Sequence, residues 1–252
     1  MAMYTLKKSL GQHFLKDEGI SQRIVASLQE HPFRRLLEVG PGGGALTKYL
    51  LQLPDIDFKA VELDEEKAVY LEGAYPLIRG KLIRGSILDI PVPWEEPFTV
   101  VGNFPYNISS QILFRVLEWK DRTEGVVGMF QKEVAQRIAA GEGSKTYGIL
   151  SVLVQAFFHV EYLFEVGEQA FTPPPKVKSA VIRLTPCADI PAFRSEEHLR
   201  RLVKTAFNQR RKMLRNAVRG LFPPEQLEDP LFDKRAEQLS VADFAALTHR
   251  MS

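Results

Sequence analysis

The sequence predicts an α/β protein, with a Rossmann-like parallel sheet followed by a smaller all-helical C-terminal domain. Short apolar runs alternate with amphipathic stretches over the first two thirds of the chain, a glycine-rich turn follows the first of these runs, and the chain after Arg194 has the pattern of helices. Such alternation is typical of βαβ units, in which helices join parallel strands and cover the sheet.

The elements follow in order along the chain. Strands are expected at 35–39, 58–62, 82–85, 98–102 and 125–130. The helices expected between and after them are 45–53, 65–74, 109–119 and 131–140. A further helix, 147–158, precedes two β-rich runs, 160–166 and 177–184. Prolines 186 and 191 bracket a link, so we place a catalytic domain at 1–186 and a helical, basic domain at 187–252.

The composition excludes several classes of protein. With 252 residues, 45% hydrophobic and 25% charged, the chain is typical of globular proteins and not of disordered ones. The richest apolar stretch, 148–158, is shorter than the ~20 residues of a membrane span, and no secretory signal is visible. The single cysteine, Cys187, excludes an internal disulfide, and five scattered histidines suggest no metal site. We therefore expect a soluble, cytoplasmic monomer without a metal or a membrane partner.

A glycine-rich turn after the first expected strand predicts a nucleotide site. Gly40 and Gly42 let a ligand approach backbone N–H groups, and Glu62 lies 20 residues beyond Gly42, where a carboxylate accepts ribose hydroxyls. This pattern leaves NAD, S-adenosylmethionine and a purely structural βα turn open. Glu38, just before the turn, disfavours a pyrophosphate and suits a sulfonium ligand that carries an ammonium group. We therefore favour a methyl-donor site.

The tetrapeptide Asn103-Phe104-Pro105-Tyr106 follows the fourth expected strand, so it should face the same ligand. It resembles the signature of methyltransferases that act on exocyclic amino groups of nucleobases. The Asn103 side-chain oxygen and the Phe104 carbonyl could each accept a hydrogen bond from adenine N6, which would localise the nitrogen lone pair. Pro105 restricts the backbone, and Tyr106 offers a face on which a flipped base can stack. An ordinary Asn-Pro turn is the alternative.

Six segments in the same order resemble successive motifs of the ribosomal RNA adenine dimethyltransferase family. They are 7–15, 40–44, 103–107, 131–134, 171–181 and 206–216. The last two favour the small-subunit (KsgA) type over the branch that acts on the large subunit. The resemblance implies a class I S-adenosylmethionine methyltransferase sheet. It also implies dimethylation of N6 on adenines, two adjacent ones, in the 16S rRNA of an immature small subunit.

The family also implies roles for single residues. The predicted cofactor-binding residues are Gln12, His13, Leu15, Glu38, Gly40, Gly42, Glu62, Ser86 and Asn103. The predicted catalytic residues are Asn103, Phe104, Pro105, Tyr106 and Phe171. Two positions depart from the family: His13 stands where Asn is usual, and Ser86 where an Asp usually accepts the cofactor's adenine amino group, with Asp89 as a possible substitute. Phe171 would give the target base a second aromatic face, opposite Tyr106; a core phenylalanine is the alternative.

Positive charge gathers towards the C-terminus, where residues 171–252 contain 15 Lys and Arg against 9 Asp and Glu. On a helical wheel that starts at Leu199, apolar residues occupy one side. The predicted RNA-binding cations occupy the other: Arg200, Arg201, Lys204, Arg211, Lys212, Arg215 and Arg219. Interleaved acids are missing there, which favours a phosphate-contacting surface over a merely solvated one.

Two further functions stay open. A non-catalytic ribosome assembly factor could retain the cofactor fold, although the intact glycine turn and Asn103–Tyr106 argue against the loss of catalysis. A nicotinamide-dependent oxidoreductase would leave the tetrapeptide and the basic C-terminal segment without a role.

Overall fold

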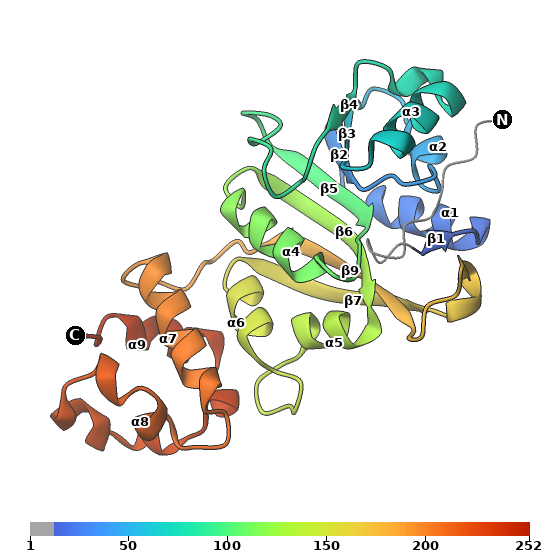
Figure 1. The fold of residues 1–252 in the computed structure, drawn as a ribbon. Helices are drawn as coiled ribbons and strands as arrows, with labels where there is room; N and C mark the ends of the chain where they lie inside the picture. The colour runs from blue at the N-terminus through green and yellow to red at the C-terminus, as the bar shows by residue number, and fades with distance from the viewer. Residues whose placement is uncertain (1–12) are drawn as a thin grey trace. The chain divides into compact units, whose positions relative to one another are not determined.

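The computed structural model describes residues 13–252, and the chain within them forms two compact units (Figure 1). The first unit ends at Ala135 and resumes from Glu161 to Pro186. The second unit comprises Gln136–Val160 and Cys187–Ser252. The chain thus passes from one unit to the other after residues 135, 160 and 186, and the division into domains at 1–186 and 187–252 stays a prediction. The catalytic and RNA-contacting roles assigned to 1–186 and 187–252 stay predictions.

A seven-stranded sheet has the order β4-β3-β2-β5-β6-β9-β7. Its strands are β2 (Arg35–Val39), β3 (Asp57–Glu62), β4 (Leu82–Arg84), β5 (Phe98–Asn103), β6 (Thr123–Gln131), β7 (Phe158–Val166) and β9 (Ser179–Pro186). The first five strands pair in parallel, and β9 pairs antiparallel with β6. The α/β prediction is confirmed, and each expected strand lies within two residues of the observed one at both ends.

The strand order reverses at β2. From β2 the chain proceeds outward through β3 and β4, and then returns to the other side of β2 to form β5 and β6. In parallel sheets, ligands bind at such a switch point, in the crevice beyond the carboxyl ends of the two strands. Leu36, Leu37 and Val39 of β2 are almost completely buried, as is expected for a central strand covered on both faces.

The helices agree less closely with expectation than the strands do. They are α1 (Glu18–Leu28), α2 (Thr47–Leu50), α3 (Glu65–Ala74), α4 (Ser109–Glu118), α5 (Lys132–Ala139), α6 (Ile149–Gln155), α7 (Glu196–Asn208), α8 (Leu214–Ala217) and α9 (Val241–Thr248). The bounds expected for α3 are those observed. The expected helix 45–53 shortens to α2, because turns occupy both of its ends. The expected helix 147–158 shortens to α6, because Phe158 already belongs to β7.

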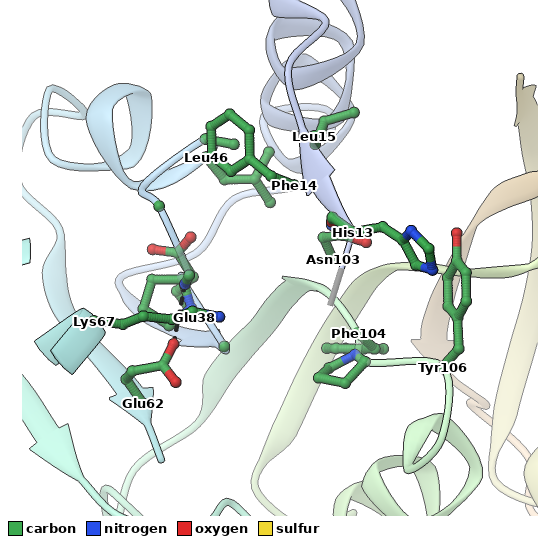
Figure 2. A pocket seen from close by; sticks show the side chains of 16 residues that line it. His13, Phe14, Leu15, Glu38, Leu46, Glu62, Lys67, Asn103, Phe104 and Tyr106 are labelled. Carbon is green, nitrogen blue, oxygen red and sulfur yellow. Dashed lines mark hydrogen bonds between the residues drawn. The ribbon is translucent and has the colours of Figure 1, made fainter. Parts of the chain in front are cut away.

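Two features were not expected from the sequence. Helix α1 begins after Asp17, whose carboxylate accepts a hydrogen bond of 3.1 Å from the backbone N–H of Ile20. Before it, β1 (Phe14–Leu15) pairs antiparallel with β8 (Phe171–Thr172), so that Leu15 lies opposite Phe171. This two-residue pairing joins parts of the chain that are far apart in sequence, and it brings His13 to the carboxyl edge of the large sheet (Figure 2).

The C-terminal segment is helical but broken. Helix α7 begins after Ser195, whose hydroxyl accepts a hydrogen bond of 3.2 Å from the backbone N–H of His198. After α8, single turns of 3-10 helix lead to α9. A helical wheel therefore describes residues 196–208 but does not extend through 219. Within residues 13–252, no helix combines the length and the apolar character needed to cross a membrane.

Candidate active site

A pocket lies at the carboxyl ends of β2, β3 and β5 (Figure 2). The pocket is open to solvent, and the space of about 720 Å³ between its walls includes solvent at its mouth. Figure 2 shows Glu38, Glu62 and Lys67 towards one end of the pocket, and Asn103, His13 and Tyr106 towards the other. The sequence predicted five of these six side chains as site residues and missed Lys67.

The glycine turn closes one wall of the pocket. Gly42 has a φ of 59° and Gly44 has a φ of 83°, and residues other than glycine rarely adopt this left-handed backbone conformation. At Gly44, a Cβ atom would also lie 2.3 Å from the ring of Tyr75. Glycine is therefore required at both positions, and the bends point the backbone N–H of Gly42 towards the end of β3.

Glu62 holds the turn in place. Its carboxylate accepts hydrogen bonds from the backbone N–H of Gly42 (3.0 Å) and from that of Asp64 (2.9 Å), one on each oxygen. The side chain is buried but lines the pocket. Because each carboxylate oxygen can accept more than one hydrogen bond, Glu62 can hold the turn and still bind a pair of hydroxyls from a ligand.

Glu38 is the second carboxyl group of the pocket, and it is 1% exposed. Burial raises its pKa to about 8, and the hydrogen bond of 2.8 Å that its carboxylate accepts from the Thr47 hydroxyl only partly opposes this. The nearby negative charge of Glu62 raises the pKa further. Without a ligand, Glu38 therefore carries a proton at neutral pH, and a cationic ligand would favour its ionised form.

The Asn103 amide is oriented by the segment that precedes β1. Its Nδ2 donates a hydrogen bond of 3.4 Å to the backbone carbonyl of His13. The side-chain oxygen of Asn103 is thereby left as an acceptor. The His13 ring is anchored as well, since its Nδ1 lies 2.8 Å from the carbonyl oxygen of Pro173. A carbonyl can only accept, so Nδ1 of His13 carries a proton in this arrangement.

Phe104 has a structural side chain. Its ring is 1% exposed and meets the ring of Phe130 edge to face, with centroids 5.0 Å apart. A Cβ atom at Gly102 or Gly128 would lie 2.7 Å or 2.5 Å from this ring. Those two glycines therefore make the space for it. Any contact of Phe104 with a substrate would come from its backbone carbonyl, as the sequence interpretation supposed, while Pro105 lines the pocket beside it.

Tyr106 is half-buried and held from two sides. Its hydroxyl lies 2.5 Å from the hydroxyl of Ser179 on β9, and its ring centroid lies 5.5 Å from that of His13. Burial raises the pKa of Tyr106, so the phenol stays protonated. The residue predicted to face it, Phe171, is instead 1% exposed in the hydrophobic core and is not part of the pocket wall. The stacking role of Phe171 stays a prediction.

The structure does not place the predicted cofactor residue Ser86, or its possible substitute Asp89, in the pocket wall. The Ser86 hydroxyl accepts a hydrogen bond of 3.1 Å from the backbone N–H of Leu88. Gln12 lies outside the described residues. The roles of these residues stay predictions. His13, Leu15, Gly40 and Gly42, in contrast, do line the pocket.

The predicted RNA-binding cations belong to the second unit. Arg200, Arg201 and Lys204 are exposed on α7, and Arg211, Lys212 and Arg219 are exposed beyond it. Arg215 differs, because its guanidinium forms an ion pair with Asp233. In residues 13–252, no group of three or more metal-ligating side chains is close enough to hold a metal ion.

Residues 3–252 match the family model of the ribosomal RNA adenine dimethylases. The chain belongs to this family. It is 51% identical to the ribosomal RNA small subunit methyltransferase A of Flavobacterium johnsoniae, over 97% of this chain and 95% of the relative. It is 48% identical to the protein of the same name from Cytophaga hutchinsonii, over 98% of this chain and 97% of the relative.

Solved structures agree with the family. A dimethyladenosine transferase from Plasmodium falciparum has a TM-score of 0.79 at 26% identity, covering 92% of this chain and 94% of the other. The 23S rRNA methyltransferase ErmE has a TM-score of 0.74 at 24% identity, covering 94% of this chain and 99% of the other. At this identity, the likeness concerns the fold alone. The predicted class I methyltransferase fold and the predicted class of enzyme, a methyltransferase, are confirmed.

Proposed function

We propose that the protein transfers methyl groups from S-adenosylmethionine to the N6 amino group of adenines in small-subunit (16S) rRNA, two to each base. The observation that carries this proposal is the orientation of Asn103. Its amide nitrogen donates to His13, so its oxygen is the atom left to accept from an amino group at the pocket. The names of the relatives at 48% and 51% identity favour the small subunit as substrate.

The pocket suits this methyl donor. S-adenosylmethionine supplies an electrophilic methyl group on a positively charged sulfur. Glu62 would accept the ribose hydroxyls, while Gly40 and Gly42 would lie against the methionine part and Glu38 would face its ammonium group. Two buried carboxyl groups in the wall of one pocket favour such a cation and disfavour the pyrophosphate of a dinucleotide. His13 and Leu15 would cover the donor from the side of β1.

The chain's own groups would prepare the adenine. Tyr106 offers a stacking face, and its bond with Ser179 fixes the tilt of its ring. The Asn103 oxygen and the Phe104 carbonyl would accept the hydrogens of N6 and localise its lone pair towards the donor. In each transfer, N6 would gain the methyl group as the methyl–sulfur bond breaks and its electron pair stays on sulfur, and N6 would then lose one proton to solvent. No strong base is needed, because the proton is acidic once the nitrogen carries its new bond.

The second unit would contact RNA through phosphates. The exposed cations Arg200, Arg201, Lys204, Arg211, Lys212 and Arg219 can neutralise phosphates without reading bases. Arg215 would have to leave Asp233 to do the same. We further propose that the substrate is an immature small subunit, that the enzyme acts as a monomer, and that it does so in the cytoplasm.

Transfer of labelled methyl groups to purified subunits tests this function. Small subunits from cells that lack the modification should accept label from the wild-type protein, whereas large subunits should not. If the protein binds the donor and the small subunit but transfers nothing, it acts as an assembly factor instead. Transfer to large subunits alone would indicate the other branch of the family.

A further inference from the structure

The loop 173–178, which joins β8 to β9, is fixed at both ends to the part of the pocket where the adenine is proposed to bind. At its start, the carbonyl oxygen of Pro173 lies 2.8 Å from Nδ1 of His13. Directly after it, the hydroxyl of Ser179 lies 2.5 Å from that of Tyr106. Figure 2 shows His13 and Tyr106 beside each other at this end of the pocket. The loop therefore lies next to the groups that would receive the base.

The exposed side chains of this loop include two cations. Lys176 and Lys178 are both exposed, and the sequence contains no Asp or Glu from residue 169 to residue 188. Within residues 13–252, neither lysine forms an ion pair with a carboxylate. A lysine ammonium group donates three hydrogen bonds and accepts none. The loop thus offers two donors of positive charge that the described chain does not use.

Acids near the loop do not outnumber its cations. Glu165 on β7 forms an ion pair of 2.7 Å with Lys132. The hydrogen bond from Lys132 lowers the pKa of Glu165, and the more distant charge of Lys178 lowers it further. Glu168 is the other acid whose charge acts on this end of the pocket. Lys132, Lys178 and Lys176 therefore stand against two carboxylates, which leaves a net positive charge.

The backbone of the loop is stiff. Prolines 173–175 occupy half of its six positions, and each has a fixed φ and no N–H group. Pro175 is buried, and the carbonyl of Lys178 accepts a hydrogen bond of 2.9 Å from the N–H of Lys132. A preorganised loop loses less conformational entropy when it binds a partner than a flexible one does. The two lysines are therefore presented from a backbone that is already in place.

We propose that the loop 173–178 is an RNA-binding surface of the first unit, which contacts the phosphates beside the target adenine through Lys176 and Lys178. The inference rests on the proposed function. A base that leaves its stack to enter a pocket stays joined to its ribose, so the phosphates on either side of it come to the mouth of that pocket. Cations there neutralise the phosphates without reading bases. This contact is additional to the cations of the second unit.

Binding of unmodified small subunits tests the inference. Filter binding in the presence of S-adenosylhomocysteine would give Kd at several salt concentrations. In the double variant Lys176→Gln/Lys178→Gln, we expect Kd to rise by about tenfold at low salt. The slope of log K against log salt should become shallower by about 1 for each phosphate contact that is lost. A double variant with arginine at both positions keeps the charges and should keep the wild-type Kd and slope.

A matched control and a second measurement separate this role from a structural one. Lys81 is an exposed lysine of the first unit outside the pocket wall, so Lys81→Gln should leave Kd and slope unchanged, unlike Lys176→Gln. In single-turnover transfer at saturating subunit, the double glutamine variant should keep its rate within about twofold and its affinity for S-adenosylhomocysteine, because neither lysine would touch the donor or N6.

The outcomes distinguish the inference from the function on which it rests. If the double glutamine variant has the wild-type Kd or the wild-type salt slope, the loop does not contact phosphates and the inference is wrong. A large fall in the saturated rate with unchanged subunit binding would overturn it as well, because the loop would then only support Tyr106. If the wild type binds donor and subunit but transfers nothing, the proposed function fails instead, and the salt slopes still show whether the loop binds RNA.

Discussion

The two ends of the pocket are built differently. At the donor end, Glu38 and Glu62 are the strand residues that lead into the loops after β2 and β3, and the glycine turn that they flank is local in sequence. At the base end, the Asn103 amide bonds to His13, 90 residues away, and the Tyr106 hydroxyl bonds to Ser179, 73 residues away. The donor end is therefore set by local strand-turn geometry, whereas the base end depends on tertiary contacts.

This difference predicts that substitutions at the two ends of the pocket should affect different measured quantities. Alterations of the donor end should appear in the affinity for the donor. Alterations of the base end should appear in the rate of transfer, with donor affinity preserved.

The largest effect is expected for Asn103→Ala. The variant loses the side-chain oxygen that would accept from N6, and preorganised acceptors of this kind contribute about 10²- to 10³-fold to a rate. We expect kcat to fall by about that factor while Kd for S-adenosylhomocysteine stays within about threefold of the wild type. Single-turnover transfer and calorimetry would measure the two quantities. Equal losses in both would mean that the ends of the pocket are not separable.

The pH dependence of ligand binding tests the role of Glu38 at the donor end of the pocket. Because the pKa of Glu38 is raised to about 8, the ligand-free protein holds a proton there at pH 7. If the ammonium group of the ligand requires the ionised carboxylate, binding releases that proton, and affinity falls by up to about tenfold for each pH unit below 8. Calorimetry in buffers of different ionisation enthalpy would count the released protons.

Glu38→Gln is the matched control for that titration. It cannot release a proton, so its donor affinity should be weak and nearly independent of pH between 6 and 8. A raised pKa in the folded state also has a consequence for stability. The contribution of Glu38 to the free energy of unfolding of the ligand-free protein is fully present below the pKa that Glu38 has in the unfolded chain. It is lost as the pH rises towards 8. A wild-type affinity that does not change over this range would contradict the account.

Glu62→Gln should have a smaller effect on affinity. The amide keeps one acceptor oxygen but loses the charge that strengthens the bonds to the backbone N–H of Gly42 and Asp64. We expect donor affinity to fall by about tenfold, with kcat at saturating donor little changed. Steady-state kinetics with varied donor would show this as a change in KM. A large fall in kcat alone would place Glu62 at the base end of the pocket.

The smallest effect is expected for Ser179→Ala. Tyr106 would lose the partner of its hydroxyl but keep its ring, so the base would stack on a less constrained face. We expect a fall in kcat of about threefold, and the same fall in Tyr106→Phe. The double variant should be no slower than either single one, because both remove the same bond. Additive losses would show that the two hydroxyls act separately.

The comparison of the two ends also explains what the sequence could predict. The parallel strands and the glycine turn follow from patterns within about 30 residues, and so Glu38, Gly42 and Glu62 were assigned from the sequence. The strand β1 has only two residues and no local signal, so neither its pairing with β8 nor the contact of His13 with Asn103 was expected.

The sequence alone does not show what surrounds two side chains, Phe171 and Lys67. The family motif predicts a stacking role for Phe171. In the structure, Phe171 pairs with Leu15 and lies in the hydrophobic core. Lys67 stands among glutamates, where a pattern-based interpretation favours a solvated helix surface; only the tertiary structure shows that it faces a pocket. In both cases the outcome depends on which distant element packs against the residue.

The central claim is that the base end of the pocket activates adenine N6. Mass spectrometry of nucleosides from unmodified small subunits, incubated with the protein and S-adenosylmethionine, tests it most directly. The account predicts that N6,N6-dimethyladenosine forms with the wild type and is nearly absent with Asn103→Ala, although both bind the donor. Methylation of another base, of another atom of adenine, or of equal extent in the variant would contradict it.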